Sequence, residues 1–347
     1  MCLIASTLAA SASAHIVYDR RTLPQWIAHA RLILVAEVRT PLLIWSAPDG
    51  SDHQEYFSVR VIEVLAGASP AQELDVFAHA EGEPRLRVGQ NMLLFLDPTA
   101  EHAEFAHLAS RFPYFTTQGA GQEWSFASGD ATLPALARAW REVLRRGGSY
   151  EDRRTLVIRQ LEMTDPRLRA DALRQLLRLR GTQDFAADGA AQKRLAEMTA
   201  TPDLSISQRI GLIKILDGIG GFSASSALMR LATSDLTAAE RLAVIRACRG
   251  VDDAAIGVWL GDQLRSTDVD VTIAALTAVA SPYHSALVEP IAVLAGDARQ
   301  RVARSAVRSL AAIGSARARA HLVRIAAGRG DAAKLAAAAL RRRTPEK

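Results

Sequence analysis

The segments LRADALRQL (168–176), QRIGLIKIL (208–216) and VARSAVRSL (302–310) share one spacing of aliphatic residues, and this spacing decides the fold. Three further segments align with them: ERLAVIRAC (240–248), VTIAALTAV (271–279) and AAKLAAAAL (332–340). The six starting positions are separated by 40, 32, 31, 31 and 30 residues. A period near thirty residues indicates stacked supersecondary units, each of them too small to bury its own apolar face.

Within each nine-residue segment, the fifth, sixth and ninth positions are apolar in every copy. The fifth position, for example, holds Ala172, Leu212, Val244, Ala275, Ala306 and Ala336. At about 100° per residue the three positions fall on one side of a helix, so we expect them to form the ladder of a shared core. Cys248 occupies the ninth position of its segment, which predicts a small buried residue and not a reactive thiol.

Each unit also predicts a second helix after a short break. These helices are expected in SASSALMRLAT (223–233), AIGVWLGDQLRS (255–266), SALVEPIAVLAG (285–296) and ARAHLVRIAAG (318–328). A carboxylate precedes most first helices, where it can cap free N–H groups: the residues are Asp165, Asp203, Asp235, Asp268 and Asp297. Thr237 and Glu240 have the spacing of a capping box.

The first helices resemble those of short HEAT repeats of the bilin-lyase-like kind, whose pattern reads D…V-R-x-x-A-x-x-x-L. Arg169, Arg209 and Arg241 occupy the family's arginine position, whereas Thr272 and Ala303 depart from it. The apolar ladder continues through both departures, so we expect an array over residues 131–347, joined to the front of the chain by a helix at Leu133–Arg145. The resemblance implies an α-solenoid of helical hairpins with an extended face for other proteins.

Residues 15–130 alternate between apolar runs and turn signals, which predicts β-structure after a short helix in TLPQWIAHA (22–30). Strands are expected at Arg31–Val38, Tyr56–Leu65, Glu73–Ala80, Asn91–Asp97, Phe105–Ala109, Arg111–Thr117 and Glu123–Ala127. Seven short strands separated by turns predict a small barrel or sandwich.

The order of these strands resembles a front domain of exported bacterial proteins. Its motifs A-x-L/I-x-V-x-x-x-V, V-x-V-x-x-V-L-x-G and V-G-x-x-x-L-L-F-L correspond to Ala30–Val38, Val59–Gly67 and Val88–Leu96. That domain is OB-like and similar in shape to the inhibitor domain of metalloprotease inhibitors, but the inhibitor's N-terminal cysteine is absent here, so inhibition is not carried over. The expected fold class is α+β and multidomain: a small OB-like β-barrel followed by an α-solenoid of HEAT-like helical hairpins.

The first fourteen residues, MCLIASTLAASASA, fit the apolar region and the A-x-A cleavage site of an export signal, although the positively charged start is missing. We therefore expect export, to the periplasm or beyond the cell. If the segment is not a signal, the expected location is cytoplasmic. The apolar run is too short to span a bilayer.

Charge is unevenly distributed along the chain. Residues 1–140 hold 9 basic and 15 acidic side chains, a net of −6, whereas residues 299–347 hold 13 and 2, a net of +11. On a helical wheel, part of this charge lies on the side opposite the ladder. These residues form a candidate basic binding face: Arg301, Arg304, Arg308, Arg317 and Arg324.

Three interpretations of this basic face stay open. It is a solvated end cap of the solenoid, a site for an acidic protein (the acidic front domain included), or a site for nucleic acid. The cap ranks first, because the last unit of a solenoid needs a polar outer surface. Nucleic acid ranks last, because no aromatic residues alternate with the arginines.

No motif predicts catalysis: G-x-S-x-G, P-loop and G-x-G-x-x-G contexts are missing. We therefore assign no catalytic, cofactor-binding or metal-ligating residue and expect no cofactor. His102, Glu104 and His107 lie close together, with the first two on one face of an expected strand, but without a second ligand cluster a solvated loop is favoured over a metal site. Cleavage after Ala14 would make His15 the N-terminus, as in a copper brace, with no other support for that chemistry.

The leading hypothesis is a non-enzymatic, exported scaffold for protein–protein interaction that uses the HEAT array as its binding face. One alternative is a lyase or other enzyme on the HEAT scaffold, with a site at the junction of barrel and solenoid. A second is a polyanion or nucleic-acid binder that uses the basic C-terminal face. The partner's identity and the oligomeric state stay open.

Overall fold

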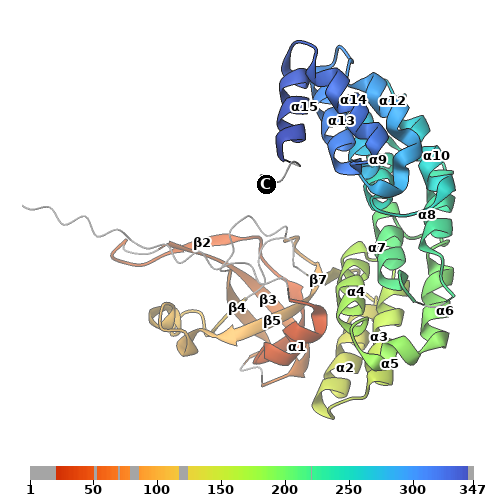
Figure 1. Ribbon diagram of the computed structural model, residues 1–347. Coiled ribbons are helices and arrows are strands. Elements are labelled where there is room, and N and C mark those ends of the chain that lie inside the picture. The colour runs from red at the N-terminus through yellow and green to blue at the C-terminus, as the bar shows by residue number, and fades with distance from the viewer. Residues whose placement is uncertain are drawn as a thin grey trace, which may run out of the picture. The chain divides into compact units, whose positions relative to one another are not determined.

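A computed structural model describes residues 21–50, 53–68, 71–78, 86–116, 124–219 and 221–342 (Figure 1). The chain divides into two compact units, and the boundary between them in the sequence lies between Gln160 and Leu161. The first unit contains a β-barrel and the helices that follow it, and the second contains helices packed in pairs. The expected α+β fold class, with a small β-barrel followed by a solenoid-like array of paired helices, is confirmed. Among the described residues, no helix has both the length and the apolar character needed to cross a membrane.

Five strands close into the barrel. Strand β1 (Leu32–Val38) pairs antiparallel with β3 (His53–Ala66) on one side and with β5 (Asn91–Pro98) on the other. Strand β4 (Glu73–Ala78) pairs with β3 and runs parallel to β6 (Tyr114–Thr116), which returns to β5. The order β1-β3-β4-β6-β5 therefore closes on itself. This is a mixed five-stranded barrel, with the side chains of its strands filling the interior.

Two short strands extend this sheet: β2 (Leu43–Ser46), paired with β3, and β7 (Trp124–Phe126), paired with β5. The sequence did not indicate β2, whose exposed residues alternate with half-buried ones. The strands expected around β6 and β7 are confirmed but shorter. Residues 79–80, 117 and 123, which belonged to three of the expected strands, lie outside the described residues.

The segment Phe105–Ala109, which we expected to be a strand, is instead a turn of 3-10 helix, η2 (Ala106–Leu108). Phe105, Leu108 and Phe112 are spaced by three and four residues, and all three are buried in one aromatic cluster. Side chains at that spacing share a side of a helical turn, whereas a strand would direct them to opposite faces. The expected strand was therefore wrong, because the local period is helical.

Helices on the C-terminal side of the barrel have a buried core of their own. Helix α2 (Thr132–Arg145) contacts α1 (Leu23–His29), and α3 (Tyr150–Glu162) follows it. Trp140 of α2 is buried, and its Nε1 donates a hydrogen bond to Oε1 of Gln160 in α3 at 3.3 Å. The expected helix at residues 133–145 is confirmed.

The second unit consists of two rows of helices (Figure 1). The first row is α4 (Pro166–Leu179), α7 (Ile206–Leu216), α9 (Ala238–Ala247), α11 (Val269–Ala278), α13 (Gln300–Ile313) and α15 (Asp331–Arg342). The second row is α6 (Gly189–Met198), α8 (Ala224–Ala232), α10 (Ala254–Gln263), α12 (Val288–Leu294) and α14 (Ala316–Ala326). Successive first-row helices contact one another, as the thirty-residue period predicts. The wider first interval arises because α5 (Gln183–Ala187) is inserted between α4 and α6.

The expected ladder of core residues is confirmed. The fifth-position residues are all 0% exposed: Ala172, Leu212, Val244, Ala275, Ala306 and Ala336. Cys248, in the ninth position, is also fully buried, and this burial raises the pKa of its thiol to about 12. A thiol with such a pKa stays protonated and unreactive, so Cys248 acts as a small core residue.

Two of the five expected aspartate caps are present. Asp165 and Asp268 accept hydrogen bonds from backbone N–H groups in the first turns of α4 and α11. Asp235 and Asp297 are not caps, because the N-cap residues of α9 and α13 are Thr237 and Arg299. The capping box that begins at Thr237 is formed at the start of α9. Helix α7 differs, because its cap is the hydroxyl of Ser205 and not the carboxylate of Asp203.

A buried histidine gives the second unit a pH dependence that can be measured. His284 lies in the 3-10 helix η3 (Pro282–Leu287), is 4% exposed, and has no hydrogen-bond partner at Nε2 among the described residues. Burial lowers the pKa of His284 from its ordinary value of 6.5, against the opposing influence of Asp252. The folded protein therefore favours the neutral ring, whereas the unfolded chain takes up a proton near pH 6.5.

The contribution of His284 to the free energy of unfolding is therefore expected to be fully present above about pH 6.5 and to decrease as the pH falls below that value. His284→Gln should reduce that loss, since glutamine does not titrate. The measurement is the free energy of unfolding in urea at about pH 7.5 and about pH 5.5. The matched control is His53→Gln, at an exposed position of β3. If both variants lose stability on acidification as the parent does, His284 is not the group responsible.

Candidate functional site

One position of the repeat carries an exposed basic side chain along the first row. The seventh position of the nine-residue unit is Arg174 in α4, Lys214 in α7, Arg246 in α9 and Arg308 in α13. All four side chains are exposed. We term these four residues the basic stripe.

The basic stripe is exposed for a local geometric reason. Position seven lies about 150° around the helix from the centre of positions five, six and nine, which are the core positions. The seventh position of α11 holds Thr277, which is exposed but neutral, and that of α15 holds Ala338. Arg304 and Lys334, one turn earlier in α13 and α15, are exposed on a neighbouring part of the same helix surface.

Most charges of the basic stripe are not neutralised within the described part of the chain. There, Lys214, Arg246 and Arg308 have neither a side-chain hydrogen bond nor an ion-pair partner. Arg174 is the exception, since it contacts Oδ1 of Asp171 at 3.2 Å. Like charges at neighbouring positions repel one another, so the basic stripe is a region of positive potential that an anionic partner would relieve.

The five arginines of the predicted basic C-terminal face lie in three different settings. Arg304 and Arg308 are exposed on α13 without a partner in the described ranges. Arg301, one turn before Arg304, contacts an aspartate of α11 at 3.2 Å. Arg317 and Arg324 belong to α14, a helix of the second row.

Arg317 and Arg324 take part in a cluster around Glu289 of α12. Nε of Arg317 donates to Oε1 of Glu289 at 2.8 Å, and Nε2 of His321 lies 2.8 Å from the same oxygen. Arg324 in turn donates to Nδ1 of His321 at 3.0 Å. The hydrogen bonds from His321 and then Arg317 lower the pKa of Glu289. The cluster links α12 to α14, so the contacts of Arg317 and Arg324 are with other side chains of this protein.

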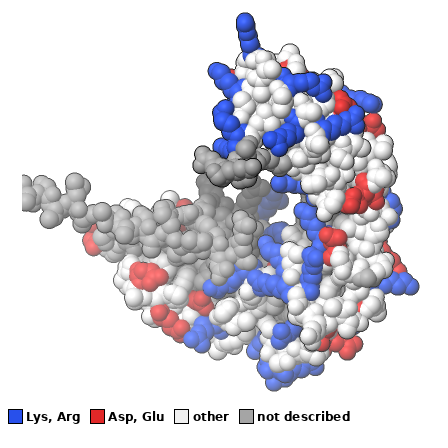
Figure 2. Space-filling view, viewed as in Figure 1, with Lys and Arg blue, Asp and Glu red and all other residues white. Residues whose placement is uncertain are grey.

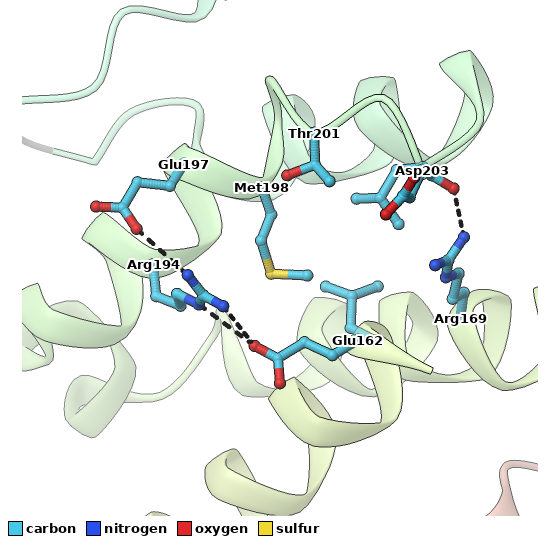
Figure 3. A pocket seen from close by; sticks show the side chains of 9 residues that line it. Glu162, Arg169, Arg194, Glu197, Met198, Thr201 and Asp203 are labelled. Atoms are coloured by element: carbon cyan, nitrogen blue, oxygen red, sulfur yellow. Dashed lines mark hydrogen bonds and ion pairs between the residues drawn. The ribbon is translucent and has the colours of Figure 1, made fainter. Parts of the chain in front are cut away.

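A pocket of about 170 Å³ lies in the second unit near the start of α4 (Figure 3). The end of α3, the start of α4, the end of α6 and the loop before α7 form its walls. It is lined by Leu161, Glu162, Arg169, Arg194, Glu197, Met198, Thr201, Asp203 and Leu204. Small-molecule sites usually enclose about 300–1,000 Å³, so this pocket is smaller than a usual small-molecule site.

Of the charged side chains around the pocket, Arg194 is paired with carboxylates, whereas the buried Nε of Arg169 has no hydrogen-bond partner among the described residues. Arg194 lies between two carboxylates, at 2.9 Å from Glu162 and at 3.6 Å from Glu197 (Figure 3). Arg169 donates a hydrogen bond to the carbonyl oxygen of Asp203 on the opposite side. These contacts link α3 to α6 and α4 to the loop before α7, and the arrangement is that of a structural contact between helices.

His102, Glu104 and His107, which the sequence left as a disfavoured alternative for a metal site, do not lie on a strand. They lie in turns and 3-10 helix, so the expectation that the first two share a strand face is wrong. Nδ1 of His102 is 3.9 Å from Glu104, and its ring lies edge-on to Phe115 at 4.7 Å. Across the described residues, no three His, Cys, Asp or Glu side chains are grouped to hold a metal ion. His15 lies outside the described residues.

No protein-family model matches the chain, and no curated protein matches it either. One solved structure that is similar is the crystal structure of an engineered protein from the Northeast Structural Genomics Consortium. It is 20% identical in sequence, the alignment covers 55% of this chain and 97% of the engineered one, and the TM-score is 0.36. A likeness at that TM-score carries no argument, so the function is argued from the residues alone.

Sequence reasoning missed Arg174, Lys214 and Arg246 as candidate site residues. The aligned segments contain the signal, because all three occupy the same position as Arg308.

Proposed function

We propose that the chain is a non-enzymatic scaffold for protein–protein interaction and that the first row of its HEAT-like array is the binding face. The observation that carries this proposal is the basic stripe, in which four of the six equivalent positions hold an exposed cation. Packing does not require lysine or arginine there, because the position points away from the core. A charged position that recurs on a solvated face fits a partner with an acidic surface.

Contacts at the family's arginine position support the assignment of HEAT repeats. Arg169 donates to the carbonyl of Asp203, before the next first-row helix, and Arg209 donates to a carbonyl at the end of α6. Thr272, which replaces the arginine in α11, donates its hydroxyl to the carbonyl of Ser266. At these three positions the side chain satisfies a backbone carbonyl, whereas the side chain of Arg241 has no such contact in the described residues and Ala303 has no group to donate.

Export and the origin of the front domain are also part of the proposal. The barrel's closed strand order supports an OB-like domain of the kind found in exported bacterial proteins. The export signal itself, residues 1–14, lies outside the described residues. Mass spectrometry of the N-terminus in the native host tests it: a mature chain that starts at His15 supports export, and an uncleaved chain contradicts it.

Binding of polyglutamate tests the proposed face. We expect Lys214→Glu, Arg246→Glu and Arg308→Glu together to weaken binding to the full chain by about tenfold or more, because each exposed ion pair contributes ~0.2–1 kcal/mol and reversal makes it repulsive. The matched control reverses exposed residues of the second row: Lys193→Glu, Arg230→Glu and Arg319→Glu. Fluorescence anisotropy measures both, with circular dichroism to confirm folding. Equal losses would show that net charge, and not the basic stripe, governs binding.

No specific observation in the described residues favours the enzyme alternative with a site at the junction of barrel and solenoid, which stays a prediction.

A further inference from the structure

The basic stripe repeats with the stacking of the helices. First-row helices contact one another in the order α4, α7, α9, α11, α13 and α15, and packed helices lie about 8–10 Å apart. Equivalent side chains therefore follow one another at about that interval along the row. Figure 2 shows Lys and Arg side chains over α4 and α7, and again over α13 and α15.

Of the regular forms of a polypeptide, one matches this interval on a single side. Polyproline II has three residues per turn and a rise of about 3.1 Å, so every third residue returns to the same side after about 9.3 Å. A β-strand also advances about 10 Å in three residues, but it turns the third side chain to the opposite face. An α-helix advances about 5.4 Å per turn, and two turns, at about 10.8 Å, exceed the interval.

We infer that the basic stripe binds an extended acidic segment of another protein, in the polyproline II conformation, with Asp or Glu at every third residue. This inference rests on the proposed function and specifies its partner. Arg174, Lys214 and Arg246 each meet one carboxylate in succession, the neutral Thr277 meets none, and Arg308 meets the next.

The surface beside the basic stripe suits the residues between the acids. Position three lies one turn before position seven on the same side of the helix. It holds Leu242 in α9 and Ile273 in α11, both half-buried. Half-buried aliphatic side chains next to exposed cations offer contact to proline or other apolar residues of the segment, as expected for polyproline II ligands.

The same residues argue for a polypeptide over single-stranded nucleic acid. Positions three and seven hold no aromatic residue in any of the six segments. Single strands are bound by stacking of bases on aromatic rings, and their phosphates recur at every nucleotide along the strand. A basic stripe with one cation per helix leaves most of those phosphates unpaired.

Three labelled ligands test the inference by fluorescence anisotropy with the full chain. The first peptide has six copies of Glu-Pro-Ala, one per first-row helix. The second has the same composition with all its glutamates in one block, and the third ligand is poly-uridylate. We expect the periodic peptide to bind at least about tenfold more tightly than the blocked peptide. Lys214→Glu with Arg246→Glu should remove that preference.

A variant that is expected to gain binding tests the register of the peptide on the basic stripe, because a folding defect cannot increase affinity. Thr277 is exposed, and its hydroxyl donates to the backbone carbonyl of Ile273 in its own helix. Thr277→Arg supplies a cation at the neutral position, so affinity for the periodic peptide should rise by about two- to fivefold, as one exposed ion pair allows. The blocked peptide should gain less.

Each of the other outcomes overturns a defined part of the inference or of the proposed function. If the periodic and blocked peptides bind equally well, the period-three segment is wrong while the acidic-partner scaffold stands. If neither peptide binds, the proposed function is wrong as well. If poly-uridylate binds more tightly than the periodic peptide, the partner is a nucleic acid and the inference is overturned.

Discussion

Replacing Leu310 with alanine is expected to lower the free energy of unfolding by about 2–5 kcal/mol. Leu310 occupies the ninth position of α13, is 0% exposed, and belongs to the core that successive hairpins share. Its neighbours come from several helices, so they cannot all collapse into the space that the lost carbons leave. Urea unfolding followed by circular dichroism measures the effect.

Arg304→Ala, in the same helix, is the matched control. Its side chain is exposed and has no ion-pair partner in the described ranges, so the free energy of unfolding should change by less than about 1 kcal/mol. Comparable losses from the two variants would mean that the buried and exposed sides of α13 had been exchanged.

Gly67→Ala is expected to destabilise the protein by about 2–4 kcal/mol, through strain and steric overlap together. Gly67 follows β3 with φ at 76°, and a Cβ there would lie 2.4 Å from the carbonyl oxygen of Arg31 and 3.2 Å from Cα of Leu32. Both contacts are to backbone, which can move only by disturbing the pairing of β1 with β3. Urea unfolding again gives the free-energy change.

Gly89→Ala separates the two causes. Gly89 has a similar φ of 82°, but a Cβ there would meet no atom within 4 Å. Only the conformational cost of about 1–2 kcal/mol should then appear. If Gly89→Ala and Gly67→Ala destabilise the protein equally, the close approach to Arg31 carries no energetic weight.

The period of the helical array could be predicted because it is local. The core positions of one helix are separated by one, three or four residues, and their side of the helix follows from 3.6 residues per turn. Leu212, Val244 and Ala306 are each fully buried at positions which the alignment alone indicates. The same rule places Lys214 and Arg246 on the exposed side.

The barrel's short elements were harder to predict, because apolar runs of three to five residues fit more than one structure. Leu108 lies in a 3-10 turn that Phe105 directly precedes, and both side chains are buried in an aromatic cluster. Trp45 of β2 lies edge-on to Phe112 at 5.8 Å, a contact between segments far apart in the chain. Contacts of this kind determine the local structure, and a short stretch of sequence does not contain the residues that make them.

For the candidate site, the sequence by itself determined which basic side chains point away from the core, because that depends only on helical spacing within one segment. The tertiary structure decided which of them remain positively charged without compensation. Arg301 and Arg317 are neutralised by carboxylates on neighbouring helices, about thirty residues earlier in the chain, whereas Arg308 meets none in the described residues. Neutralisation depends on which helices pack side by side, and that is a property of the folded array.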